Sequence, residues 1–281
     1  MINSQKTLVA YLDILGYKEI IRNKSPEDFY NDIENVFRFV QQLIDKPVSV
    51  QTKSNVPTEG QVTNVFLKIL KFELLSDNII IYCDLADTKH INNKYYNATD
   101  QELTIVALFF EIVSLFVVYF IARTGYLLKG GVCKGKFYSN TFDSSLLDGK
   151  LIFSKALLRG YELEQLDIHP RIRILVDESL ANLWKTTPNS LHNHKLIKGK
   201  LQKDEHGEMY IDYYETLRTY TEVTKNKFIL KIIERINDML VKKDVKMRAR
   251  EKWHWFKEYH NEKIKSFAET ENQDLNSLLI N

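Results

Sequence analysis

Several residue types and motifs that mark common protein classes are scarce or absent in this sequence. It has two cysteines among 281 residues. Cys83 and Cys133 lie in separate apolar runs without paired spacing, which favours buried thiols in a reducing compartment over a disulfide framework or a zinc site. The patterns Gly-x-x-x-x-Gly-Lys-Ser/Thr, His-Glu-x-x-His and Gly-x-Ser-x-Gly do not occur. Their absence excludes several common enzyme classes.

A strong charge of either sign is also missing. Lys and Arg number 39 against 37 Asp and Glu, which gives a net charge of +2. No overall field favours nucleic acid or anionic lipid, so we expect no nucleic-acid partner. The first residues, MINSQKT, are polar and lack the apolar core of a signal peptide. We therefore expect a cytoplasmic protein.

One long hydrophobic run stands out. Residues 104–122 are apolar over about 19 positions, near the length that spans a bilayer. However, Glu111 lies in the middle of this run, and a carboxylate is costly inside a membrane. Polar residues 100–102 precede the run, and Arg123-Thr124-Gly125 follows it like a helix C-terminus. We therefore predict a helix covered by protein and expect no membrane partner.

The remaining apolar patterns predict alternating strands and helices. Strands are expected at 7–13, 65–75, 79–83, 126–138, 171–176 and 209–214, and helices at 26–45, 104–122, 151–164 and 178–184. Residues 46–64 have the composition of an inserted loop. This order predicts an α+β fold, an antiparallel-sheet palm of the ferredoxin-like type with helices on one face. We expect the palm over 1–214 and a helical extension over 215–281 that packs on the palm or on a dimer partner.

Two aspartates fall where a palm holds divalent metal. Asp13 ends the first strand, and Asp77 lies in the turn Ser76-Asp77-Asn78 between two strands. Two carboxylates can bind one or two Mg²⁺ or Mn²⁺ ions on a nucleoside triphosphate. The carbonyl of Ile14 is a further candidate ligand. The candidates for phosphate contact through helix-opening amides are Leu15, Gly16, Tyr17 and Lys18.

The same aspartates have a purely structural interpretation. An acid at a strand end often caps the next helix, and an acid in a hairpin turn is a common turn residue. A joint role is favoured because an ionisable group beside a long apolar run costs free energy unless it is paired or bound to metal.

Three segments resemble the motifs of class III nucleotidyl cyclases. AYLDILGYKEII resembles the first metal-site motif, LLSDNIIIYC the second, and LLKGGVCKGKFY the glycine strand that follows. The resemblance implies a palm of the nucleotidyl cyclase type, with Asp13 and Asp77 as metal ligands. It also implies Mg²⁺ or Mn²⁺ as the cofactor, a nucleoside triphosphate as substrate and a homodimer.

Later segments resemble a bacterial branch of this family, the anti-phage pyrimidine cyclases. The segments are GYELE at 160–164, HPRI at 169–172, DEHG at 204–207 before MYIDYY, and Trp255 followed by His260-Asn261. This closer resemblance implies formation of 3',5'-cyclic UMP or CMP in antiviral defence. It also implies an effector, encoded elsewhere, that responds to the cyclic nucleotide.

One departure from the family pattern puts turnover in doubt. Leu158 and Glu162 stand where class III cyclases carry an Asn and a transition-state Arg. We therefore consider Lys129 and Arg159 as substitute catalytic cations. A nucleotide-binding module without turnover is the alternative function, and a palm-type polymerase or nuclease is a weaker one.

Two other features favour a structural interpretation over a functional one. His192 and His194 have metal-like spacing, but they lie in a polar segment without an evident third ligand. The aromatic residues Trp253, Trp255 and Tyr259 on the helical tail favour core or dimer packing over base stacking.

Overall fold

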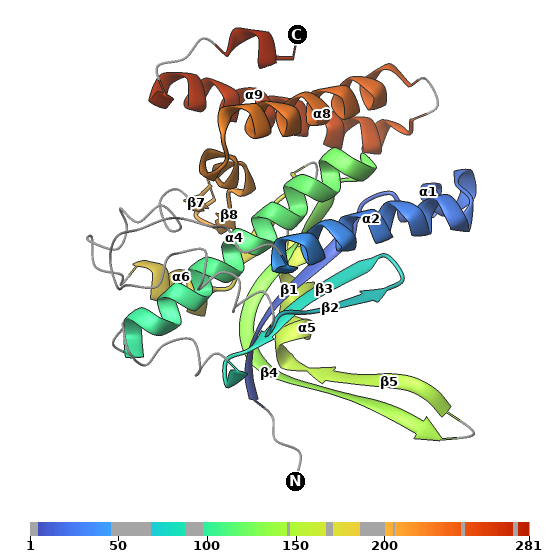
Figure 1. Ribbon diagram of the computed structural model, residues 1–281, viewed down its shortest axis with the longest axis vertical. Coiled ribbons are helices and arrows are strands. Elements are labelled where there is room, and N and C mark those ends of the chain that lie inside the picture. Colours follow the sequence, from blue (N-terminus) through green and yellow to red (C-terminus); the bar gives the residue numbers. More distant parts are fainter. Residues whose placement is uncertain are drawn as a thin grey trace.

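The computed structural model describes residues 5–45, 69–87, 98–144, 147–166, 171–185, 200–204, 206–242, 245–271 and 275–280 (Figure 1). The strands are β1 Gln5–Ile14, β2 Lys71–Leu75, β3 Asn78–Asp84, β4 Leu128–Ser144, β5 Leu147–Ser154, β6 Ile174–Val176, β7 Leu201–Lys203 and β8 Met209–Ile211. The helices are α1 Tyr17–Asn23, α2 Pro26–Asp45, α4 Ala98–Thr124, α5 Lys155–Leu166, α6 Glu178–Lys185, α8 Glu222–Val241 and α9 Met247–Glu271, with 3-10 helices η2 Tyr213–Thr219 and η3 Asn276–Leu278.

The described strands form a single sheet in the order β2-β3-β1-β4-β6-β8-β7, and β5 pairs with β4 outside this path. The pairs β2–β3, β1–β3 and β1–β4 are all antiparallel. With α2 and α4 between them in the chain, these four strands have the β-α-β-β-α-β order of a ferredoxin-like palm. The predicted α+β fold class is confirmed. β6 extends the sheet by pairing parallel to β4.

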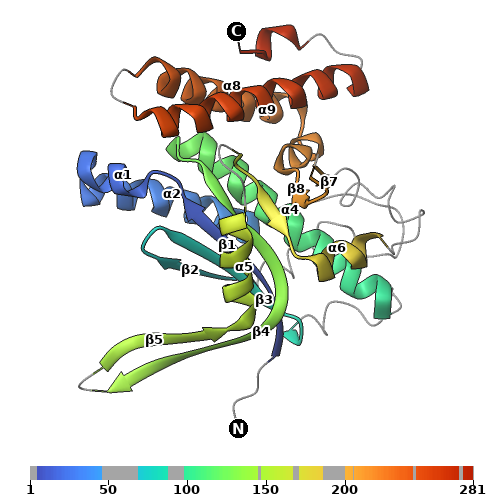
Figure 2. The same ribbon diagram turned by 180° about the vertical axis from the view of Figure 1, so that it is seen from behind.

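Strand β1 lies at the centre of the sheet, and its side chains alternate between two cores. Leu8 and Leu12 belong to the larger core, which includes residues of α2 and α4. Val9 belongs to a smaller core with Ala156 and Leu163 of α5. Helix α5 therefore covers the face opposite α2 and α4, as Figures 1 and 2 show, whereas the sequence analysis placed the helices on one face.

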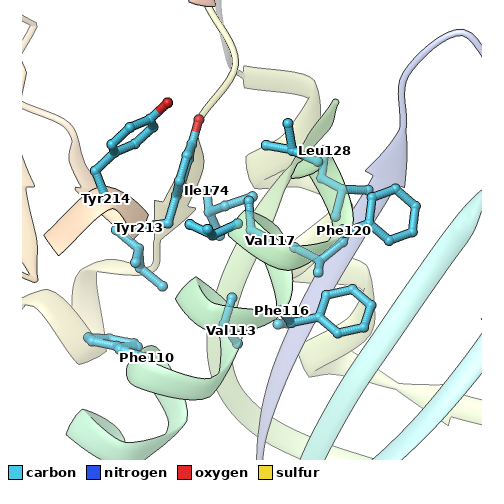
Figure 3. Close-up of a cluster of buried hydrophobic side chains, with 14 of the residues drawn as sticks. Phe110, Val113, Phe116, Val117, Phe120, Leu128, Ile174, Tyr213 and Tyr214 are labelled. Carbon is cyan, nitrogen blue, oxygen red and sulfur yellow. The ribbon is translucent and has the colours of Figure 1, made fainter. Parts of the chain in front are cut away.

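Helix α4 is the centre of the larger core. By length and composition its residues Glu102–Thr124 could cross a membrane, but 89% of the most apolar stretch is buried inside the protein. Figure 3 shows side chains of α4 packing beside Leu128, Ile174 and Tyr213. Glu111 is paired with Lys200 and accepts a hydrogen bond from Thr216. The prediction of a helix covered by protein is confirmed for these residues.

Helices α8 and α9 lie side by side across the end of the molecule near α1 (Figures 1 and 2). His260 explains part of the attachment. Its Nε2 donates to the carbonyl of Leu278 at 3.0 Å, so Nδ1 accepts from the Tyr214 hydroxyl at 2.8 Å. Asn261 exchanges two hydrogen bonds with the backbone of Ile280. The His-Asn pair of the tail motif therefore fixes the C-terminal segment.

Several predicted boundaries are wrong. Residues 147–154 form β5, so the helix predicted at 151–164 begins only at Lys155. Pairing with β4 overrides the helical pattern there, and Ser154 caps α5 by accepting from the amide of Leu157 at 3.0 Å. The predicted strand 209–214 ends at Ile211 because Asp212 caps η2. Of the predicted strand 65–75, residues 65–68 lie outside the described residues and β2 begins at Lys71, while β6 is confined to 174–176.

Candidate functional site

The sheet brings Asp13 and Asp77 together. Antiparallel pairing of β1 with β3 sets Asp13 opposite Asn78, and the amide of Ile14 donates to the carbonyl of Asp77 at 2.8 Å. The turn between β2 and β3 is tight, with Ser76 at a φ of 58°. Asn78 Nδ2 donates to Asp77 Oδ1 at 2.9 Å and so orients that carboxylate. Both predicted acidic residues lie at the same end of the sheet.

A third carboxylate, Glu164, joins them from α5. Its side chain is buried, and its carboxylate pairs with the Lys129 ammonium. Lys129 lies on β4 directly opposite Asp13 and also donates to the Glu164 carbonyl at 3.2 Å. Sequence reasoning did not select Glu164 as a site residue. The available signal was its helical spacing from Gly160, which is four positions earlier on the sheet-facing side of α5.

Helix α5 comes this close because the facing strand carries glycine. A Cβ at Gly131 would lie 2.6 Å from the Gly160 carbonyl and 2.6 Å from Leu163 Cβ. A Cβ at Gly160 would lie 2.9 Å from Tyr11 Cβ. The glycines of β4 and α5 thus allow close backbone approach, which sets the position of Glu164 over the sheet.

The electrostatics of the cluster disfavour simultaneous ionisation of Asp13, Asp77 and Glu164. Burial, followed by the nearby charges of Glu164 and Asp77, raises the pKa of Asp13 to about 6. Lys129 and Lys252 of α9 oppose this rise. Burial and the same carboxylates also raise the pKa of Tyr11. The folded protein therefore holds Asp13 in an environment that a bound cation would stabilise.

The donor set fits a magnesium or manganese ion shared with a phosphate ligand. No cluster of three or more His, Cys, Asp or Glu side chains in the described ranges is arranged to hold a metal alone. Mg²⁺, however, commonly uses one or two carboxylates together with substrate phosphates and water. Asp13 and Asp77 supply such a pair. Asn78 Oδ1 adds a buried acceptor without a hydrogen-bond partner among the described atoms.

The predicted phosphate-binding amides receive mixed support. The amide of Leu15 donates to the carbonyl of Leu127 at 3.0 Å, so its predicted phosphate contact is wrong. Gly16 adopts a φ of 80° as the N-cap of α1 and has no capping side chain. Tyr17 packs edge-on against Phe29, and Lys18 is exposed. The amides of Gly16, Tyr17 and Lys18 remain candidates at the helix start.

Of the two predicted catalytic cations, only Lys129 reaches the cluster. Arg159 Nε donates to Asp177 at 2.9 Å, and Arg159 also pairs with Glu162. The backbone amide of Asp177 donates to the carbonyl of Val132. Val132 lies three residues along β4 from Lys129, so the backbone of Asp177 is about 10 Å from that of Lys129. The predicted catalytic role of Arg159 is corrected to anchoring α5 to the start of α6.

The two positions that depart from the cyclase pattern lie on the surface. The side chain of Leu158 is 57% exposed, and Glu162 is also exposed. Neither faces the acidic cluster within this chain. His192 and His194 fall outside the described residues.

A cavity of about 580 Å³ lies farther along the sheet, and none of the cluster residues lines it. Its lining residues are Arg171, Arg173, Lys203, Asp204, Tyr210, Trp255, Glu258, Tyr259, Asn261, Glu262 and Lys265. The carbonyl of Arg173 accepts from the amide of Gly130, the residue after Lys129. The cavity therefore begins one strand beyond Lys129 of β4 and two strands from β1, between the sheet and α9.

Part of this cavity wall stabilises the fold. Asp204 pairs with Arg173 and Arg171, and it accepts from the amides of His206 and Glu208 at 2.9 and 2.8 Å. These bonds hold the β7–β8 turn. The Pro-Arg-Ile and acidic-turn segments of the sequence therefore meet in one ion-pair network.

No family model matches the chain, and no curated protein matches it in sequence. Solved structures do match. The adenylyl cyclase CyaB from P. aeruginosa is 12% identical over 75% of this chain and 95% of that chain, with a TM-score of 0.43. The guanylate cyclase domain of RhGC from Catenaria anguillulae, in complex with GTP, is 10% identical over 74% and 94%, with a TM-score of 0.40.

A class III adenylyl cyclase-like ATP-binding protein from Pseudomonas aeruginosa is 9% identical over 76% of this chain and 40% of that chain, with a TM-score of 0.40. All three TM-scores lie below 0.5. These likenesses therefore do not by themselves establish a function for this chain.

Proposed function

We propose that this chain is a metal-dependent nucleotidyl cyclase that forms a 3',5'-cyclic nucleotide and pyrophosphate from a nucleoside triphosphate. The observation that carries the proposal is the meeting of Asp13 and Asp77 at one end of a ferredoxin-like palm. Burial and the neighbouring carboxylates Glu164 and Asp77 raise the pKa of Asp13, so keeping this group ionised costs free energy. Such costs are concentrated at functional sites.

Mg²⁺ or Mn²⁺, when bound, would neutralise phosphate charge and lower the pKa of the ribose hydroxyl. Asp13 and Asp77 would hold the ion, and Asn78 would orient Asp77. In the reaction the ribose 3' oxygen bonds to the α-phosphorus, the bond to the pyrophosphate oxygen breaks, and the hydroxyl proton passes to solvent. Positioning and charge neutralisation are the main demands of this chemistry.

The substrate base and the biological role are also proposals. The segments shared with pyrimidine cyclases favour UTP or CTP as substrate, with a cytoplasmic effector that responds to the cyclic product in antiviral defence. The cavity of about 580 Å³ between the sheet and α9 lies within the usual size range of small-molecule sites and gives room for a nucleoside.

A homodimer is the proposed assembly. Leu158, Tyr161 and Leu166 of α5 are exposed apolar residues on the face that carries Glu162. A second copy of this chain would cover this apolar face. Light scattering should show a dimer for the wild type, and Leu158→Asp should shift it to a monomer without changing the melting temperature.

The activity test uses purified protein, Mn²⁺ and each of the four ribonucleoside triphosphates. Mass spectrometry should detect one or more 3',5'-cyclic nucleotides, with pyrophosphate in equal amount. Asp13→Asn should abolish the product, whereas Asp238→Asn on the exposed face of α8 should not. Wild-type protein that yields no cyclic product from any triphosphate contradicts the proposal.

A nucleotide-binding module without turnover is the second candidate. The observation that favours this candidate is the bond between Arg159 and Asp177. Because Arg159 is held there, α5 brings no arginine to Asp13. Calorimetry that shows triphosphate binding in Mn²⁺ without cyclic product would support this candidate.

A further inference from the structure

Helix α9 brings a lysine from the C-terminal extension to the acidic cluster. The Lys252 ammonium interacts attractively with Asp13 and Glu164, and repulsively with Lys129 and Arg248. Its side chain is half-buried, and the described part of the chain gives it no hydrogen bond or salt bridge. Lys252 is thus a half-buried cation that interacts with the carboxylates through space without being bound to one.

Contacts just before α9 and in its middle hold the helix in this position. Lys246, just before the helix, pairs with Glu19 of α1, the helix that directly follows Asp13 in the chain. Two turns beyond Lys252, the Tyr259 hydroxyl donates to Asp212 at 2.7 Å. Lys263 Nζ lies 2.7 Å from the other Asp212 oxygen. In Figures 1 and 2, α9 crosses the end of the molecule beside α1.

The spacing along α9 connects Lys252 to the cavity. Lys252, Trp255 and Tyr259 follow one another at helical intervals of three and four residues, so they share one side of the helix. Trp255 and Tyr259 line the cavity. On the opposite wall, Lys129 at the cluster is followed one strand later by Arg173 in the cavity. Lys252 therefore lies on the side of α9 that lines the cavity and is close enough to the cluster to interact with Asp13 and Glu164.

We propose that Lys252 is a catalytic residue that binds the substrate phosphates and supplies the positive charge for which the cyclase pattern uses the arginine replaced here by Glu162. This inference rests on the proposed function. A lysine is a common phosphate ligand as a mobile point charge. Burial, together with repulsion from Lys129 and Arg248, lowers the pKa of Lys252, and a phosphate beside the ammonium would favour its charged form.

The proposal makes the extension part of the catalytic unit. The palm residues of one chain supply the carboxylates, and α9 of the same chain supplies the cation. A triphosphate bound by Asp13 and Asp77 through metal would then have Lys252 on the side of the cavity. The charge on the phosphates would be offset from both sides during bond breaking.

The test compares Lys252→Ala and Lys252→Arg with Lys227→Ala, which changes an exposed lysine of α8. Lys252→Ala should lower kcat/KM at least about tenfold, because a charge-assisted contact is lost. Lys252→Arg should recover most of this loss, and Lys227→Ala should change nothing. All three variants should melt within about 2 °C of the wild type. An unchanged kcat/KM for Lys252→Ala in an active enzyme overturns the proposal and leaves the cyclase assignment standing.

Binding separates the two proposals if the wild type makes no cyclic product. The probes are a non-hydrolysable triphosphate and the matching nucleoside, each titrated with Mn²⁺ present. Lys252→Ala should weaken the triphosphate about tenfold and leave the nucleoside unchanged. Equal triphosphate affinity in Lys252→Ala and wild type would overturn the role of Lys252. A selective loss would support phosphate binding by Lys252 even though turnover had failed.

Discussion

Two clusters of ionisable residues in this molecule differ both in burial and in how their charges are compensated. At the end of β1, three carboxylates gather around one engaged lysine, and the pKa of Asp13 rises to about 6. Under α9, Asp212 is fully buried and meets Lys263 at 2.7 Å. Burial alone lowers the pKa of Lys263, but Asp212 more than offsets this effect and the pKa is raised.

The difference separates function from architecture. Asp212 also accepts from the Tyr259 hydroxyl at 2.7 Å and from the amide of Tyr214 at 3.3 Å, so its charge is satisfied within the fold. Asp13 has no equivalent set of donors among the described residues and lies beside other carboxylates. A buried charge that the fold satisfies holds elements together, whereas one that the fold leaves unsatisfied is suited to an external cation.

The largest expected effect comes from breaking the satisfied cluster. Asp212→Asn leaves Lys263 buried without its counter-charge, so the free energy of unfolding should fall by about 3 kcal/mol or more. Glu262→Gln is the matched control, because Glu262 lies 3.5 Å from the same ammonium but is exposed. Urea unfolding at pH 7 measures both. Equal losses in the two variants would show that the burial of Asp212 does not matter.

Neutralising the unsatisfied cluster should have the opposite outcome. Asp13→Asn should not lower the free energy of unfolding in EDTA, because it removes repulsion with Glu164 and Asp77. Mn²⁺ at about 100 times its Kd should stabilise the wild type by about 2.7 kcal/mol. The same Mn²⁺ should not stabilise Asp13→Asn, as thermal melts would record. Equal Mn²⁺ stabilisation of both proteins would place the ion elsewhere.

A smaller effect tests how α5 delivers Glu164 to the cluster. Gly131→Ala forces a Cβ to within 2.6 Å of α5, so it should cost about 2 kcal/mol and displace Glu164. Gly135→Ala is the comparison, since its Cβ would lie 3.2 Å from Ala156. Unfolding curves should rank Gly131→Ala as the more damaging substitution. A larger loss for Gly135→Ala would contradict the close approach at Gly131.

The last prediction concerns two opposite pH dependences, each with a slope of at most about 1.4 kcal/mol per pH unit. The pKa of Asp13 is raised from 3.8 to about 6, so its contribution to stability is lost as pH rises through about 4 to 6. Burial lowers the pKa of His260 from 6.5 to about 4, so its contribution is lost as pH falls through about 6.5 to 4.

Urea unfolding in EDTA over pH 4 to 7 separates the two slopes. Subtracting the curve of Asp13→Asn from that of the wild type should leave a component that falls with rising pH. Subtracting His260→Gln should leave one that falls with decreasing pH. Slopes of the same sign would show that one of the two environments is misassigned.

The acidic pair was predictable because its signals are local. A β-rich run that ends in Asp13 and a turn that displays Asp77 can each be read within about ten residues. Glu164 was harder to predict, because its role depends on α5 crossing to the face opposite α4. Arg159 was chosen for its charge, but Asp177, which binds it, lies 18 residues later on another element.

The sequence by itself determined the palm, the order of its apolar strand segments along the chain and the two aspartates at strand ends. Alternating burial along a strand and the residue preferences of turns both act between near neighbours in the chain. Only the tertiary structure decided which cations reach those aspartates. Lys129 lies beside Asp13 because of the strand register between β1 and β4. Lys252 lies near Asp13 because ion pairs of Lys263 with Asp212 and of Lys246 with Glu19 hold α9 across the end of the sheet. Long-range packing sets such distances, and no local pattern encodes them.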